Sequence, residues 1–134
     1  MGGSGFSWIN MWHSLAGPNA HFVLETVGRI LREQIRAEDC AARIGGDEFV
    51  IILPGRTEAQ TLQTIAARII TRVSHPMEFE GKPCQVSGSI GIVRSTDLRA
   101  PDAAQIMAAS DRALYAAKHA GRAQAVLMSG DTPA

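Results

Sequence analysis

The sequence predicts an α/β fold in which helices flank a central, mostly antiparallel sheet. Two segments, 43–53 and 77–93, have apolar and β-branched runs beside Gly-containing turns, a pattern typical of β-hairpins. Three further segments, 19–37, 57–74 and 102–120, carry apolar residues every three or four positions, as amphipathic helices do. Strands and helices alternating in this order favour one layered α/β sandwich.

Length and composition set limits on what the protein does. With 134 residues the chain fits one domain, and its 46% apolar residues are too dispersed for a membrane span. Thirteen basic and thirteen acidic side chains cancel, so no overall field attracts nucleic acid, and we expect any nucleotide to be held by a local site. Two distant cysteines, Cys40 and Cys84, do not form a disulfide scaffold, which favours a cytoplasmic location.

The first eighteen residues differ in character from the rest of the chain. Residues 1–5 have the composition of a flexible leader, so we leave them out of the fold. Residues 6–12 are apolar and aromatic, which fits either a short strand or a hydrophobic plug, with both tryptophans packing. We therefore divide the chain into an atypical or flexible N-terminal segment, a domain and a C-terminal tail: 1–18, 19–128 and 129–134.

The first helix is expected to begin with Asn19 as its N-cap and to end near Ala37. Its apolar face consists of Val23, Val27, Ile30, Leu31 and Ile35. Just beyond it, Arg36 and Asp39 are three residues apart. Their simplest interpretation is a local ion pair, although an arginine fork beside a carboxylate can also bind phosphate and a guanine edge.

The turn of the first hairpin combines two glycines with two carboxylates. Gly45 and Gly46 can adopt the positive φ values of a tight turn and leave room for an anionic ligand to lie against the backbone. Asp47 and Glu48 follow at the mouth of the turn, where adjacent carboxylates can hold a divalent cation or accept a proton from a hydroxyl. The alternative is an ordinary hairpin with a solvated acidic turn.

The second helix is expected to start at Thr57, with Gln60 completing a capping box, and to end at His75-Pro76. Arg68 and Arg72 are expected to point outward. Its predicted apolar face consists of Leu62, Ile65, Ala66, Ile69, Ile70 and Val73.

The segment 77–93 is expected to turn at 81–83 and to continue into a strand whose small residues, within 86–92, let helices approach.

The last helix is expected to end before Gly121, and residues 124–127 are expected to add an edge strand. The apolar face of the last helix consists of Ile106, Ala109, Ala113, Leu114 and Ala117. Near its end, Lys118 and Arg122 are four residues apart, so they face one anion or are two solvated cations at a helix C-terminus.

Two of these segments resemble one known family. R-I-G-G-D-E-F-V-I-I-L at 43–53 looks like the signature of GGDEF domains, the diguanylate cyclases of bacterial cyclic di-GMP signalling. S-D-R-A-L-Y-A-A-K-H-A-G-R at 110–122 is similar to that family's A-D-x-A-L-Y-x-A-K-x-x-G-R. The resemblance extends from about Phe22 to about Val126 and implies a nucleotidyl-cyclase-like α/β sandwich.

The resemblance implies roles for the residues that match the motifs. Asp47 and Glu48 would serve catalysis and hold Mg²⁺, whereas Lys118 and Arg122, with Gly45 and Gly46, would bind the GTP substrate. The spacing of Arg36 and Asp39 from Gly45 is similar to that of the family's inhibitory RxxD site, which binds cyclic di-GMP, and Arg68 is the candidate for a second arginine on the following helix.

The N-terminal segment departs from the family pattern. A typical member has D-x-D-x-F-K-x-x-N-D and then G-H-x-x-G-D before the first long helix. Aligning residues 6–10 with the first of these motifs leaves Gly2 and Ser4 at the metal-binding aspartates, whereas counting back from Gly45 instead puts His21 at the guanine-binding aspartate. We therefore expect a degenerate GGDEF domain that binds cyclic di-GMP at the RxxD site. The alternative is an active diguanylate cyclase that uses GTP and Mg²⁺. In either case we expect a homodimer, which cyclic di-GMP itself can bridge.

Overall fold

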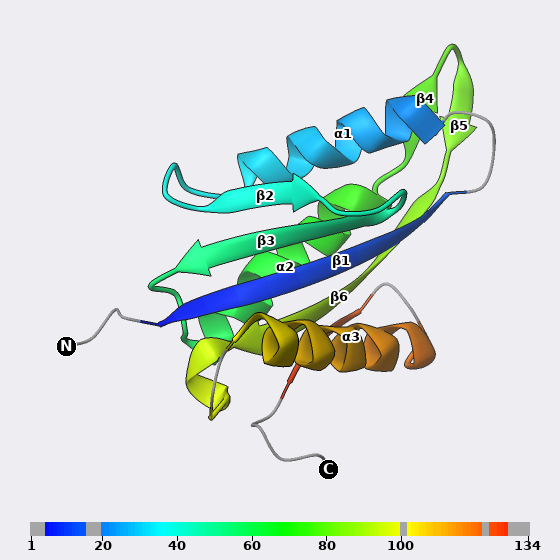
Figure 1. Ribbon diagram of the computed structural model, residues 1–134. Helices are drawn as coiled ribbons and strands as arrows, with labels where there is room; N and C mark the ends of the chain where they lie inside the picture. Colours follow the sequence, from blue (N-terminus) through cyan, green and yellow to red (C-terminus); the bar gives the residue numbers. More distant parts are fainter. Residues whose placement is uncertain (1–4, 16–19, 100–101, 122–123, 129–134) are drawn as a thin grey trace.

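A computed structural model describes residues 5–15, 20–99, 102–121 and 124–128 (Figure 1). Three α-helices and seven strands follow one another along this described part of the chain. Their bounds are β1 (Phe6–Leu15), α1 (Ala20–Glu33), β2 (Cys40–Arg43), β3 (Glu48–Pro54), α2 (Ala59–Ser74), β4 (Met77–Phe79), β5 (Lys82–Cys84), β6 (Val86–Arg94), a 3₁₀ turn (Ser95–Asp97), α3 (Ala103–His119) and β7 (Ala125–Leu127).

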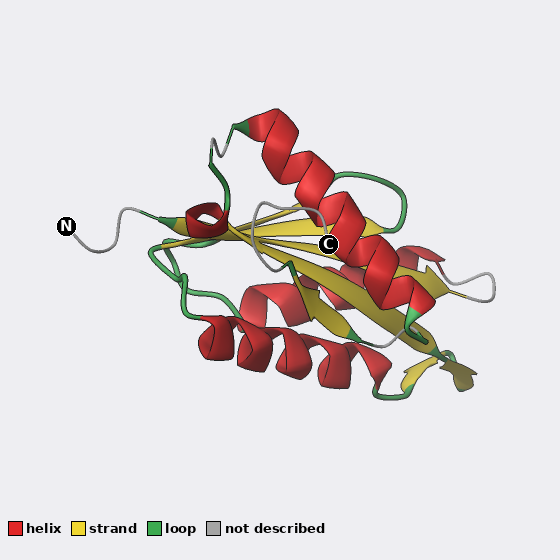
Figure 2. Cartoon of the chain, turned by 90° about the horizontal axis from the view of Figure 1, so that it is seen from below, coloured by secondary structure: helices red, strands yellow, loops and turns green. Residues whose placement is uncertain are grey.

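The main sheet has five strands in the order β2-β3-β1-β6-β7. All neighbours are antiparallel except β6 and β7, which are parallel. Figure 2 shows α3 on one face of this sheet and the other two helices on the opposite face. The predicted α/β sandwich with a mostly antiparallel sheet is therefore confirmed. No helix in the described ranges combines the length and apolarity that crossing a bilayer requires.

Strand β1 lies in the middle of the sheet, between β3 and β6. Of the two forms considered for residues 6–12, the strand is correct, and it runs on to Leu15. Ile9 and Met11 are fully buried in the core beneath α1 and α2, whereas the alternate residue Asn10 contacts Ser110 of α3 through its side-chain amide. Burial on both faces explains why most residues of this strand are apolar.

Helix α1 ends at Glu33, four residues earlier than expected. Val23, Val27, Ile30 and Leu31 are buried as predicted, whereas Ile35 lies beyond the helix and is only partly buried. The early end has a local cause, because the Asp39 carboxylate accepts a 2.7 Å hydrogen bond from the Arg36 backbone N–H and replaces a helical partner there. Asn19, the expected N-cap, lies outside the described residues.

The capping box predicted for the second helix is wrong. The N-cap of α2 is Glu58 and not Thr57, and its side chain makes no capping hydrogen bond. The carbonyl of Thr57 instead accepts a hydrogen bond from Arg94 Nη1 at 3.2 Å, which keeps that residue in the preceding loop. The rest of the prediction is confirmed, since the helix ends before His75, its apolar face is buried except for partly buried Ile70, and Arg68 and Arg72 are exposed.

Residues 77–84 form a separate two-stranded hairpin, β4–β5, so Lys82 and Pro83 belong to a strand and not to the expected turn. The turn is Glu80-Gly81, where both residues have positive φ, 53° and 79°. Such a pair matches the twist of a two-residue hairpin. Strand β6 then pairs with β1 in the main sheet and is not part of this hairpin.

Helix α3 packs closely on β6 because Gly91 has no side chain. A Cβ at this position would lie 2.5 Å from the backbone nitrogen of Leu114. The expectation that small residues of this strand admit a helix is thus confirmed. The helix has the predicted buried face, an N-cap at Asp102 that accepts from the Gln105 N–H, and Gly121 in the left-handed region at its end.

Candidate functional site

The acidic turn joins β2 to β3, and the N–H of Ile44 closes it by donating to the Glu48 carbonyl at 3.0 Å. The predicted hairpin is therefore present, but neither Gly45 nor Gly46 has a positive φ. Four residues connect the strands, so the turn does not need the left-handed geometry of a two-residue connection. What Gly46 provides is open space, since a Cβ there would meet nothing within 4 Å.

Asp47 contacts the central strand and not a second carboxylate. Its Oδ2 accepts a 2.9 Å hydrogen bond from the indole nitrogen of Trp12, and its carbonyl accepts from the His13 N–H at 3.1 Å. Lys118 of α3 places its ammonium 4.2 Å from the centre of the Trp12 ring, within the range of a cation–π contact. Trp12 thus connects the acidic turn to the helix that carries Lys118.

The sequence did not reveal this role for Trp12. Only the register of β1 against β3, in which Trp12 pairs with Glu48, brings the indole to the acidic turn. Glu48 itself is half-buried at the start of β3. Arg122, expected to act with Lys118, lies outside the described residues.

His13 is buried next to the acidic turn, with 2% of its surface exposed. Burial lowers its pKa below 6.5, and although the Asp47 charge opposes this effect, Arg43 adds to it. Its Nδ1 has no hydrogen-bond partner in the described part of the chain. A depression of about 300 Å³ opens beside it, lined by His13, Ala20, Leu24, Gly46 and Asp47.

We expect the domain to lose stability when the pH falls below about 6.5, the ordinary pKa of histidine. Because the folded state lowers the pKa of His13, the unfolded chain binds more protons between the lowered value and 6.5, so unfolding becomes easier as the pH falls through that window. Urea unfolding between pH 5 and 8 measures the slope. His13→Gln should flatten it, whereas an equal slope in His21→Gln serves as the control, since His21 is exposed.

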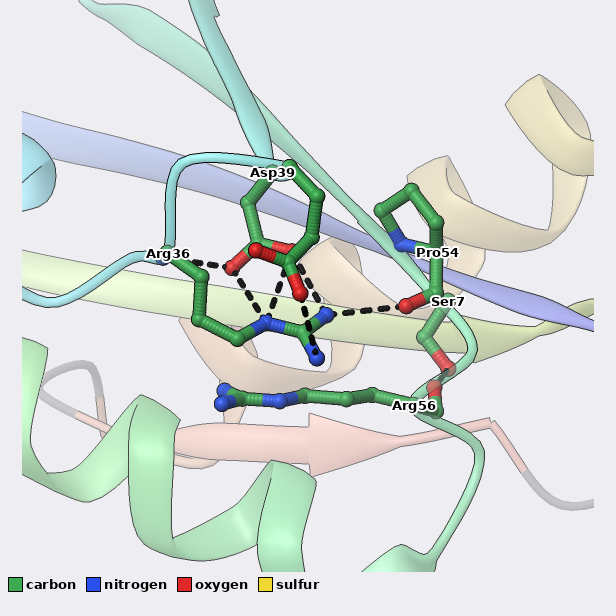
Figure 3. Close-up of polar contacts among 6 residues, drawn as sticks. Ser7, Arg36, Asp39, Pro54 and Arg56 are labelled. Carbon is green, nitrogen blue, oxygen red and sulfur yellow. Dashed lines mark hydrogen bonds and ion pairs between the residues drawn. The ribbon is translucent and has the colours of Figure 1, made fainter. Parts of the chain in front are cut away.

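The second cluster is built by Arg36 and Asp39, as Figure 3 shows. Arg36 Nη2 donates to Asp39 Oδ1 at 2.7 Å, and Nε lies 3.1 Å and 3.2 Å from the two carboxylate oxygens. Nη2 also donates to the Pro54 carbonyl at 2.8 Å, which ties this cluster to the end of β3. The remaining nitrogen, Nη1, lies 3.4 Å from the Glu38 carboxylate.

The two charges stabilise each other. The side chain of Asp39 is 0% exposed and that of Arg36 is 32% exposed. Burial by itself raises the pKa of the Asp39 carboxyl, but the hydrogen bonds and charge of Arg36, helped by the charge of Arg56, outweigh it and hold the pKa below its usual range. The same hydrogen bonds raise the pKa of Arg36. Of the interpretations left open by the sequence, the ion pair is present, and it does not exclude a ligand at the outer edge of Arg36.

A family model described as "Diguanylate cyclase, GGDEF domain" matches residues 19–124. The chain belongs to the GGDEF family. Diguanylate cyclase A of Treponema denticola is 36% identical over 112 residues, which are 83% of this chain and 30% of that protein. The chain therefore spans less than a third of this relative's length.

Solved GGDEF domains share the fold. The GGDEF domain of YfiN (TpbB) from Pseudomonas aeruginosa has a TM-score of 0.80 at 24% identity, with 94% of this chain and 83% of that chain covered. The GGDEF domain of DgcB from Caulobacter crescentus, solved in complex with c-di-GMP, has a TM-score of 0.74 at 20% identity, with 94% and 79% covered. The recognition of the family from two motifs is confirmed.

The described part of β1 offers a divalent metal ion no carboxylate. Diguanylate cyclases of the family generally use such ions. Here β1, FSWINMWHSL, contains no Asp or Glu, and the group beside the Asp47 carboxylate is an indole N–H donor. An N–H donor cannot ligate a cation, and the described residues contain no group of three or more His, Cys, Asp or Glu able to hold one. Among the described residues, Asp47 and Glu48 therefore lack a third side-chain ligand for the ion.

Two further residues of the GGDEF domain lie apart from these clusters. Arg68 is exposed on α2 and lines a depression of about 490 Å³ that also includes Gln34, two residues before Arg36. His21 is exposed near the start of α1, 3.5 Å from Glu25, and lines a groove of about 410 Å³ between α1 and β2. No hydrogen bond or ion pair between described residues joins Arg68 to Arg36 or Asp39.

Proposed function

We propose that the chain is a degenerate GGDEF domain that does not condense GTP and instead binds cyclic di-GMP at Arg36 and Asp39. The observation that supports this most strongly is the contrast between the two clusters. The Arg36–Asp39 cluster has its expected partners within hydrogen-bond distance, whereas the Asp47 carboxylate faces the Trp12 indole.

The geometry of the acidic turn supports the loss of catalysis. Condensing two GTP molecules needs metal ions that neutralise the phosphates and align the attacking 3′-hydroxyl. Asp47 and Glu48 lie at the mouth of the turn, but no carboxylate of β1 complements them. His21 stands where the resemblance expects a guanine-binding aspartate, so that contact is also missing.

The chemistry of the RxxD cluster supports binding of cyclic di-GMP. A guanidinium binds a phosphate or the guanine edge through parallel hydrogen bonds, and a carboxylate accepts from guanine N1 and N2. Because Asp39 is fully engaged by Arg36, a guanine reaches it only by replacing some of those bonds, so the ligand exchanges one charge-assisted contact for another. Ligand complexes are established for the similar DgcB domain.

Three measurements test the proposal. Calorimetric titration of the chain with cyclic di-GMP should show saturable binding, and chromatography after incubation with GTP and Mg²⁺ should show no cyclic di-GMP formed. An absence of binding would remove the receptor function. Because cyclic di-GMP is two-fold symmetric, it can join two domains, so sedimentation should show a dimer in its presence.

The second candidate is an active diguanylate cyclase of the cytoplasm. The position of Lys118 near the acidic turn favours it, because this cation lies where the resemblance expects one for the GTP phosphates. Turnover that disappears in Asp47→Ala or Glu48→Ala would establish this second function in place of the first.

A further inference from the structure

The end of β3 and the loop that follows it, residues 54–57, form a backbone hydrogen bond at every residue. Arg36 donates to the carbonyl of Pro54, and the N–H of Gly55 donates to the Gly5 carbonyl at 2.8 Å. The Ser7 hydroxyl donates to the Arg56 carbonyl, and Arg94 donates to the carbonyl of Thr57. These bonds hold the backbone of the loop in place before any ligand binds, so the point from which the Arg56 side chain extends is fixed.

Arg56 projects from this loop toward the Arg36–Asp39 cluster. Figure 3 shows its side chain extended alongside the guanidinium of Arg36. The positive charge of Arg56 helps to lower the pKa of the Asp39 carboxyl. Arg56 also lines a depression of about 320 Å³ together with Gly55, Thr57, Glu58 and Thr61.

The two arginines of this region differ in what their guanidinium groups contact. Arg36 uses Nε and Nη2 on Asp39 and Pro54 and has Glu38 near Nη1. By contrast, no hydrogen bond or ion pair joins the guanidinium of Arg56 to another described residue. The charge of Arg36 is matched by Asp39, whereas the Glu58 carboxylate accepts from the Thr61 hydroxyl at 2.6 Å. Of the two arginines, Arg56 is therefore the one whose guanidinium has no direct polar partner among the described residues.

We propose that Arg56 is a phosphate-binding residue of the RxxD cluster and takes a phosphodiester of the bound dinucleotide. This inference rests on the proposed function, and it divides one ligand among three side chains. Arg36 and Asp39 receive the guanine edge, and Arg56 receives the phosphate beside it. A guanidinium with five unused donors can chelate two phosphate oxygens without first giving up a protein partner.

Replacing Arg56 tests the assignment. Arg56→Gln should weaken cyclic di-GMP binding by about tenfold, because one charge-assisted contact is lost, and Arg56→Lys should recover part of the affinity by restoring the charge without the fork. Arg112→Gln is the matched control, since Arg112 is exposed on α3 on the opposite face of the sheet. The thermal midpoint of each variant should equal that of the wild type, because the loop is anchored through backbone groups.

A second measurement separates this inference from the proposed function. In the wild type, the arginine Nε–Hε resonances are followed by NMR during addition of inorganic phosphate. The Arg56 resonance should shift and saturate, while that of Arg112 should not. If cyclic di-GMP binds and Arg56→Gln binds it as tightly as the wild type, the role of Arg56 is wrong and the receptor function remains. If cyclic di-GMP does not bind, the receptor function fails, and the phosphate titration alone decides whether Arg56 forms an anion site.

Discussion

Arg36→Ala is expected to reduce the affinity for cyclic di-GMP by about ten- to a hundred-fold, as loss of a charge-assisted bidentate contact does. The substitution also removes the partner of Asp39, whose buried carboxylate then faces the ligand without its compensating cation. Both effects act in the same direction, because an uncompensated carboxylate repels the phosphates. Calorimetry with the wild type and the variant measures the change.

Two variants serve as controls for this experiment. Arg29→Ala removes an exposed arginine of α1 that pairs with Glu33 at 3.7 Å, away from the cluster, and should bind like the wild type. Arg36→Lys keeps the charge but loses the planar fork, so it should lie between the wild type and Arg36→Ala. Equal affinity of the wild type and Arg36→Ala, with both proteins folded, would show that the ligand binds elsewhere.

The sequence predicted the helices well wherever periodicity alone decided their packing. The apolar faces of α2 and α3 are buried as expected, because a repeat of 3.6 residues places them on one side whatever the partner. It failed at the helix ends, where single contacts decide. Asp39 ends α1 by capturing the Arg36 N–H, and Arg94, nearly forty residues along the chain, keeps Thr57 out of α2.

The site was predictable where it is local in the sequence. Arg36 and Asp39 are three residues apart, and the acidic turn is a single hairpin, so both were visible as motifs. The contact of Trp12 with Asp47 joins residues that are distant along the chain. It depends on β1 entering the middle of the sheet, a pairing that no short pattern in the sequence specifies. The position of Arg56 near Asp39 follows instead from the register of β2 against β3, with Cys40 opposite Ile52, which the sequence does not specify either.

Trp12→Asp is expected to create a divalent metal site at the acidic turn. The indole nitrogen of Trp12 lies 2.9 Å from the Asp47 carboxylate, so the side chain of residue 12 already points at that group. An aspartate is much shorter than a tryptophan and leaves a gap between the two carboxylates. A cation with oxygen ligands at about 2.0–2.6 Å on each side fills such a gap.

Thermal unfolding provides the measurement, with the midpoint temperature as the quantity compared. Without metal, two adjacent carboxylates repel each other, so Trp12→Asp should unfold at a lower temperature than the wild type. Adding Mn²⁺ or Mg²⁺ should raise the thermal midpoint of the variant in a concentration-dependent way, since a ligand bound only by the folded state stabilises it, and should leave the wild type unchanged. Trp12→Asn has the same size without the charge, so it separates metal binding from the loss of the indole. A midpoint that responds to metal equally in Trp12→Asp and Trp12→Asn would contradict the prediction, and a response in the wild type would show that Asp47 and Glu48 hold the ion without a partner on β1.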